Sequence, residues 1–175
     1  EFLELDDVPQ RIEVYDNSHI QGTKAVGAMV VASVEGFEKG QYRKFNIKSA
    51  QTNDDFGMMR EVMSRRFRNL AENPDGEEGK ANSHETVWPD LVLIDGGKGH
   101  LGAALQVFLE LGIDNVPLAS LAKENEELFV PHTPEAILLP RRSQGLFLVQ
   151  RLRDEAHRFA VTFHRERRSK RSVQS

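Results

Sequence analysis

Cysteine is absent from this 175-residue chain, so the chain can form no disulfide bond and can offer no thiolate to a metal ion. Any metal site must therefore use aspartate, glutamate, histidine or backbone oxygen. No apolar run approaches the roughly 20 residues that a membrane-spanning helix needs. The first residues also lack the basic start and apolar run of a signal peptide. Together these absences favour a cytoplasmic protein without a membrane segment.

The nucleotide-binding P-loop is missing too, since the glycine-rich turn at 96–99 is not part of a GxxxxGK[ST] pattern. This disfavours an enzyme that acts on nucleotide phosphates. The formal net charge of −4 alone argues weakly against nucleic-acid binding. The charge is uneven, however: acidic residues crowd 1–7 and 72–85, whereas 141–171 is dominated by arginine and lysine.

Hydrophobic periodicity divides the first half of the chain into strands and one helix. Residues 11–16 and 42–49 alternate, and 25–34 form a continuous apolar run, which predicts a three-stranded antiparallel meander. An apolar stripe from Phe56 to Leu70 has helical spacing and predicts a helix. The polar stretch 71–86 is typical of a surface loop.

The second half changes to a pattern of alternating strands and helices. Residues 90–95 predict a central parallel strand, followed by a helix that Gly112 ends. A strand at 116–121, a hairpin within 128–139 and a long helix capped by Ser143 complete the order. A meander followed by β-α-β-α predicts an α/β fold with a mixed sheet and helices on both faces.

The domain boundaries follow from these elements. We expect an N-terminal extension at 1–10, one α/β domain at 11–164 and a basic tail at 165–175 that frays. The tail is consistent with an edge that faces DNA or with a linker to a further domain.

Two aspartates end predicted strands, Asp16 in the first and Asp95 in the central one. If these strands are parallel neighbours, their backbones lie about 4.8 Å apart and the carboxylates come close together. Like charges at that separation are unfavourable unless a cation lies between them, which favours a divalent metal site. The alternative is that each aspartate caps the turn that follows it.

Other polar residues are candidates for the same site. His157 lies at the edge of the apolar stripe of the last helix, where it could bind metal or transfer a proton, or be an ordinary packed or surface histidine. Asp54 and Asp55 can both cap a helix. Lys98, Arg158 and the pair Arg141–Arg142 are suited to phosphate contact, with a tight turn or solvated charges as the alternative.

Four blocks of the sequence resemble the UvrC family, the incision subunit of bacterial nucleotide excision repair. The family's D-x-S-H-x-x-G signature resembles residues 15–22 (YDNSHIQG). Its second and third signatures resemble 93–99 (LIDGGKG) and 151–160 (RLRDEAHRFA), and Asp54-Asp55-Phe56 with Met59-Arg60 resembles a further block. The four blocks occur in the family's order, although His100 stands where glutamine is commoner.

The resemblance implies an RNase H-like fold and a metal-dependent endonuclease that makes the 5′ incision beside a DNA lesion. The family's Asp-Asp-His catalytic set carries over to Asp16, Asp95 and His157, which would also bind the metal, and a further acidic residue falls on Asp55. Carboxylate oxygens suit Mg²⁺ or Mn²⁺, and an imidazole ligand favours Mn²⁺.

The resemblance also implies partners: damaged double-stranded DNA, and the UvrB protein through parts of the family's proteins that this chain does not contain. The family's amino-terminal nuclease and its helix-hairpin-helix module have no counterpart in the sequence. A non-catalytic module of the same fold that binds DNA or a repair partner is the alternative function.

Overall fold

The computed structural model describes residues 9–20, 24–48, 54–72, 87–122, 127–133, 135–138 and 143–174. Of residues 19, 20, 24 and 162–174 it describes the backbone alone. No helix within these ranges is both long and apolar enough to cross a membrane.

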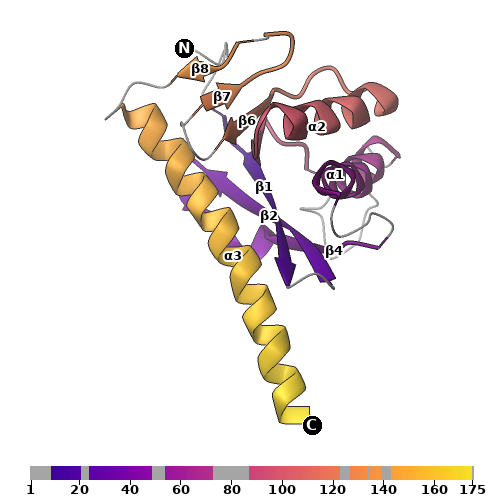
Figure 1. Ribbon diagram of the computed structural model, residues 1–175. Helices are drawn as coiled ribbons and strands as arrows, with labels where there is room; N and C mark the ends of the chain where they lie inside the picture. The colour runs from indigo at the N-terminus through magenta and orange to yellow at the C-terminus, as the bar shows by residue number, and fades with distance from the viewer. Residues whose placement is uncertain are drawn as a thin grey trace.

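One mixed sheet forms the centre of the molecule (Figure 1). Its strands run in the spatial order β3-β2-β1-β5-β6-β7-β8, and β4 also pairs with β2. Strands β1 and β2 are antiparallel, β5 is parallel to β1 and β6 is parallel to β5. The bounds are β1 Ile12–Ile20, β2 Lys24–Ser33, β3 Gly36–Phe37, β4 Arg43–Asn46, β5 Leu91–Asp95, β6 Leu118–Ala122, β7 Glu127–Phe129 and β8 Ile137–Leu138.

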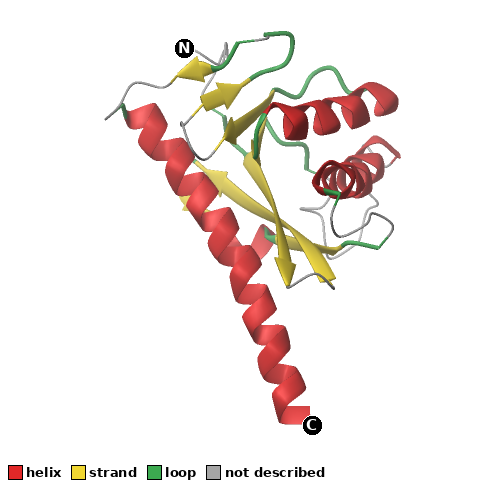
Figure 2. Cartoon of the chain, viewed as in Figure 1, coloured by secondary structure: helices red, strands yellow, loops and turns green. Residues whose placement is uncertain are grey.

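Three α-helices cover the sheet, with α1 (Asp55–Glu72) and α2 (Lys98–Leu111) on one face and α3 (Gln144–Gln174) crossing the other (Figure 2). A short 3₁₀ helix, η1 (Lys39–Gln41), precedes β4. Gly112 ends α2 in the left-handed conformation (φ 72°), and the Ser143 hydroxyl caps α3 by accepting from the Leu146 N–H at 3.1 Å. Both caps were expected from the sequence.

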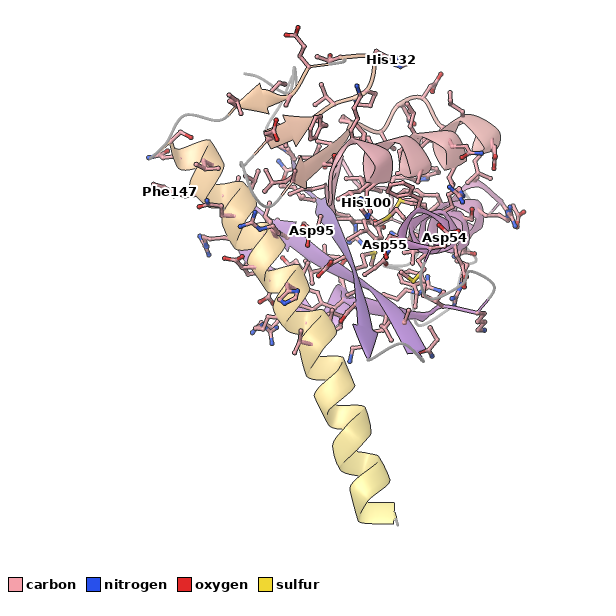
Figure 3. The ribbon with its side chains drawn as sticks, viewed as in Figure 1. Asp54, Asp55, Asp95, His100, His132 and Phe147 are labelled. Carbon is pink, nitrogen blue, oxygen red and sulfur yellow. The ribbon has the colours of Figure 1, made fainter. Side chains whose placement is uncertain are left out.

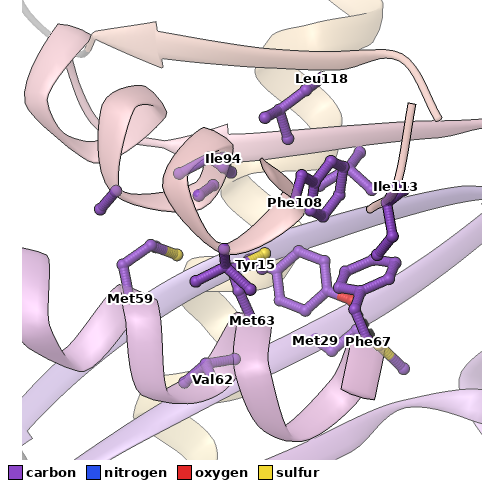
Figure 4. Close-up of a cluster of buried hydrophobic side chains, with 14 of the residues drawn as sticks. Tyr15, Met29, Met59, Val62, Met63, Phe67, Ile94, Phe108, Ile113 and Leu118 are labelled. Carbon is purple, nitrogen blue, oxygen red and sulfur yellow. Dashed lines mark hydrogen bonds between the residues drawn. The ribbon is translucent and has the colours of Figure 1, made fainter. Parts of the chain in front are cut away.

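Each face of the sheet has its own hydrophobic core. Beneath α1 and α2, the residues of β1 and β5 that point to this face pack with Met59, Met63, Phe67 and Phe108 (Figure 4). Beneath α3, the alternate residues of the same strands pack with Leu146, Val149, Leu152 and Ala156. Two residues of α3, Ala156 and Ala160, are fully buried, so small side chains let this helix lie close to the sheet.

The structure confirms the predicted mixed sheet but differs in three details. Strand β1 does not end at Asp16 and continues to Ile20 along β2. The expected turn at 36–40 contains strand β3 and the start of η1. The basic tail, expected to lie beyond the domain and to fray, continues α3 as a helix to Gln174.

Candidate active site

Asp16 and Asp95 lie next to each other across the parallel pair β1 and β5. The register pairs Val14 with Leu93 and Tyr15 with Ile94, and the two aspartates are the next residue on each strand. Val14 and Leu93 both belong to the core under α3, so by alternation the two carboxylates point to the same face. Asp16 is 5% exposed and Asp95 is 9% exposed.

The sheet opens directly after these two residues. Strand β5 ends at Asp95, and the next N–H, that of Gly96, donates to the Leu121 carbonyl on β6 at 3.0 Å. Strand β1 runs on beside β2 alone. Asp16 is therefore not at a strand end, as the sequence suggested, but at the point where β1 and β5 separate. Such divergence points between parallel strands are where ligands bind in open α/β sheets.

His157 reaches this point from α3. Its Nδ1 lies 3.3 Å from Oδ2 of Asp16, and 56% of the His157 side chain is exposed. The histidine thus connects a buried carboxylate to solvent. The structure brings Asp16 and His157 into contact across 141 positions of sequence, and His157 is at the same time a surface histidine, so its role in the site stays a prediction.

Asp54 and Asp55 have different positions at the start of α1. Asp54 caps the helix, since its Oδ1 accepts from the Gly57 N–H at 2.9 Å, and it lies 3.9 Å from Arg60. Asp55 is the first residue of α1 and is exposed. Figure 3 shows both aspartates at the end of α1 that lies toward His100 and Asp95.

The glycine-rich turn after Asp95 is explained largely by packing. A Cβ at Gly96 (φ 155°) would overlap the His100 side chain, and a Cβ at Gly99 would overlap the Phe56 ring. A Cβ at Gly97, the N-cap of α2, would meet nothing within 4 Å. Packing against His100 and Phe56 therefore accounts for Gly96 and Gly99. Lys98 is exposed in the first turn of α2, where its predicted contact with phosphate stays a prediction.

Comparison with known proteins identifies the family of the chain. The family model described as the UvrC RNase H endonuclease domain matches residues 1–161. The chain belongs to the UvrC family. It is 59% identical to the UvrABC system protein C of Novosphingobium aromaticivorans over 97% of the chain, and 54% identical to that of Paramagnetospirillum magneticum over all of it. The chain spans only 26% and 28% of the length of these relatives.

Solved structures with a similar arrangement are distant. The endonuclease V of Ciona intestinalis, in complex with inosine-containing DNA, is 18% identical, with a TM-score of 0.43 over 84% of this chain and 56% of that one. The RuvC of Thermus thermophilus is 13% identical, with a TM-score of 0.31 over 64% of this chain and 61% of that one.

In this UvrC domain, the side chain of Arg158 forms an ion pair with Glu155 on the same helix. It donates to both carboxylate oxygens of Glu155 at 2.7 and 2.8 Å, and Tyr42 donates to Glu155 at 2.6 Å. The hydrogen bonds from Arg158 lower the pKa of Glu155, while burial and the hydrogen bond to Glu155 raise the pKa of Tyr42. Glu155 thus has two described partners and joins α3 to the segment before β4.

Sequence reasoning missed this Tyr42–Glu155–Arg158 cluster. The spacing of Glu155 and Arg158 by three residues on a helix predicts their contact, but nothing in the sequence indicates Tyr42, which lies 113 positions from Glu155. The predicted phosphate-binding pair Arg141–Arg142 and the side chain of His19 lie outside what the structure describes.

Proposed function

We propose that this domain is a divalent-metal-dependent DNA endonuclease that hydrolyses one phosphodiester bond, with Asp16, Asp95 and His157 as its catalytic residues. The observation that carries the proposal is the register of β1 and β5, together with the contact between His157 and Asp16. Two nearly buried carboxylates on one face repel each other, and a cation between them removes that repulsion.

The residues fit Mg²⁺ or Mn²⁺ in their chemistry. The part of the chain that the structure describes contains no group of three or more Asp, Glu or His side chains already arranged to hold a metal ion. Asp16 and Asp95 would therefore supply the first ligands, and His157 would complete or border the set. When bound there, a divalent ion lowers the pKa of a coordinated water and stabilises charge on the phosphate oxygens.

His157 is suited to move a proton. Asp16 faces its Nδ1 and orients the ring, and the exposure of the side chain leaves the imidazole open to solvent and substrate. The ring nitrogen that does not face Asp16 exchanges a proton with the attacking water or with the departing sugar oxygen. Asp55, at the start of α1, is the further acidic residue that we propose for the site.

DNA is held by its backbone in this proposal, since an enzyme that cuts beside varied lesions needs contacts that do not depend on sequence. Lys98, exposed at the start of α2, is one candidate. Arg141 and Arg142, which lie outside the described residues, are candidates from the sequence alone. Arg158 contributes only if it exchanges Glu155 for a phosphate. We further propose that the reaction is the 5′ incision of bacterial nucleotide excision repair, in the cytoplasm, on damaged double-stranded DNA and with UvrB as partner.

One observation favours the alternative, a non-catalytic module that binds DNA or a repair partner: the lack of a ready group of three metal ligands among the described residues. Such a module has no need for two adjacent carboxylates in contact with a histidine. The two functions therefore differ in whether Asp95 is needed for a metal-dependent reaction.

Calorimetric titration of Mn²⁺ into the chain tests the proposal. We expect saturable binding that Asp95→Asn abolishes and that Asp114→Asn leaves unchanged, because Asp114 is an exposed aspartate beyond the other end of α2. Incision of a 5′-labelled duplex with a lesion should show the same pattern. Metal binding and incision that persist in Asp95→Asn would remove Asp95 from the mechanism, and normal DNA binding without any metal-dependent cleavage would favour the non-catalytic module.

A further inference from the structure

A large aromatic side chain is exposed beside the proposed catalytic site. Phe56, in the first turn of α1, has 45% of its surface exposed although it directly follows Asp55. The other apolar residues of the stripe that predicted this helix, from Met59 onward, are fully buried. Phe56 thus lies outside the core that explains the rest of the stripe.

The ring of Phe56 is nevertheless held in a defined position. It meets the ring of His100 edge to face, with centroids 5.0 Å apart and an interplanar angle of 87°. It also fills the space where a Cβ at residue 99 would lie, which accounts for Gly99 in the first turn of α2. Both neighbours come from α2, so the two helix starts present one aromatic surface, the Phe56–His100 pair. An aromatic ring held in this way loses little conformational freedom when it binds a ligand.

The Phe56–His100 pair lies close to the proposed cutting site. Gly99 is only four positions after Asp95 in the chain, so their backbones are at most about 14 Å apart. This distance corresponds to about four nucleotide steps along a DNA strand, at roughly 3.4 Å each. Lys98, between the two, adds a positive charge suited to a phosphate of the same strand.

We propose that the Phe56–His100 pair binds an unstacked nucleobase of the DNA strand that is cut, within a few nucleotides of the scissile phosphate. This rests on the proposed endonuclease function and adds a substrate class to it: DNA that is locally unpaired beside the cut. A base inside an intact duplex offers no free face to an aromatic ring, whereas an unpaired base does. Stacking of bases on aromatic side chains tolerates any sequence, as an enzyme for varied lesions requires.

The test uses photo-crosslinking of the chain carrying Asp95→Asn, which leaves the DNA uncut. The probe is DNA with a short unpaired bubble, in which 5-iododeoxyuridine replaces successive bases of one strand. We expect a crosslink at one or two adjacent positions that mass spectrometry maps to Phe56 or His100. Phe56→Leu keeps an apolar side chain in contact with Gly99 and should lose the crosslink, whereas Phe56→Tyr should keep it.

Fluorescence anisotropy on the same DNA measures the strength of the contact. Phe56→Leu should weaken binding to the bubble by about five- to a hundredfold, the range found for loss of one base–aromatic stack. Phe147→Leu is the matched control, because Phe147 is 49% exposed at the start of α3, well away from Asp95 and His100 (Figure 3). Its affinity for the bubble should change less than twofold, as should the affinity of Phe56→Leu for the fully paired duplex.

The outcomes separate this proposal from the function on which it rests. If Phe56→Leu binds the bubble as tightly as the wild type does, or if the crosslinks map elsewhere, the base contact is wrong and the endonuclease proposal is unaffected. If the wild-type chain binds neither DNA, both proposals fail. Loss of affinity for bubble and duplex alike in Phe56→Leu would also overturn the base contact, because it would indicate a general effect on the site.

Discussion

Replacing Arg66 by methionine should strongly destabilise the domain, because Arg66 holds a buried carboxylate in the core under α1. Arg66 and Glu13 are both fully buried. The Arg66 Nη2 donates to Glu13 at 2.7 Å and to the Val87 carbonyl at 2.9 Å, and its Nε donates to Glu13 at 3.3 Å. Burial alone would lower the pKa of Arg66, but the attraction of Glu13 raises it, so the guanidinium stays charged.

The size of the effect follows from what remains after the substitution. Loss of one partner of a buried ion pair costs about 3–5 kcal/mol, since the other charge stays buried. Glu13 would keep two donors, the Arg11 Nε at 3.0 Å and the Tyr15 hydroxyl. We therefore expect a loss near the lower end, about 3 kcal/mol. For a domain of this size that is a fall in melting temperature of roughly 6–12 °C.

Urea denaturation of four proteins checks this reasoning: wild type, Arg66→Met, Glu13→Leu and the double variant. Arg68→Met is the matched control, because Arg68 is exposed on the same helix and should change stability by less than about 0.5 kcal/mol. The double variant removes both charges of the Arg66–Glu13 pair, and Arg11 loses Glu13 in Glu13→Leu and in the double variant alike. The loss in the double variant should therefore be smaller than the sum of the single losses by at least about 1 kcal/mol. A loss below about 1 kcal/mol for Arg66→Met, or additive losses, would refute the claim that the pair must stay together.

Three further predictions concern the site and its surroundings. Without metal, Asp95→Asn should melt at the same temperature as the wild type or at a higher one, because it removes repulsion between adjacent carboxylates. A clear fall in melting temperature, measured by calorimetry, would contradict repulsion between Asp16 and Asp95. Glu155→Gln should reduce stability at pH 7 by up to about 1 kcal/mol. Arg158 lowers the pKa of Glu155, so this stabilisation is complete above the ordinary glutamate pKa of 4.5 and disappears as pH falls through the lowered pKa. At that low pH the melting curves of wild type and variant should converge. Gly27→Ala should reduce stability by about 1–3 kcal/mol, because its Cβ would overlap Val62 inside the core. Gly99→Ala should reduce stability much less, because the overlapping atom is the tip of the half-exposed Phe56 ring. Equal losses in urea would contradict this distinction.

Much of the fold was predictable because its signals are local. Alternation in 11–16, the continuous apolar run at 90–95 and the cap residues Gly112 and Ser143 each depend on a few neighbouring residues, and the structure confirms all of them. The end of β1 was not predictable in this way. Residues 17–19 are polar for a strand, and pairing with β2 continues the strand through them to Ile20.

The candidate site was likewise predictable only where its signals are local. A carboxylate after each of two apolar strands indicates a site, but the neighbouring positions of Asp16 and Asp95 depend on a parallel register that pairs residues 79 positions apart. The exposure of Phe56 was not predictable for a related reason. Its spacing places it in one apolar stripe with Met59 and Met63, and only the structure shows that its ring lies at the surface beside His100 of α2.

The position of His157 links the site to the docking of α3. His157 meets Asp16 only because Ala156 and Ala160 let the helix lie close to the sheet, at the strands that carry the site. The Tyr42–Glu155–Arg158 cluster attaches the same turn of α3 to the segment before β4. The two carboxylates, by contrast, are placed by strand pairing alone. Loosening α3 should therefore separate the proton-transferring group from the carboxylates while leaving the carboxylate pair, and with it most of the metal affinity, in place.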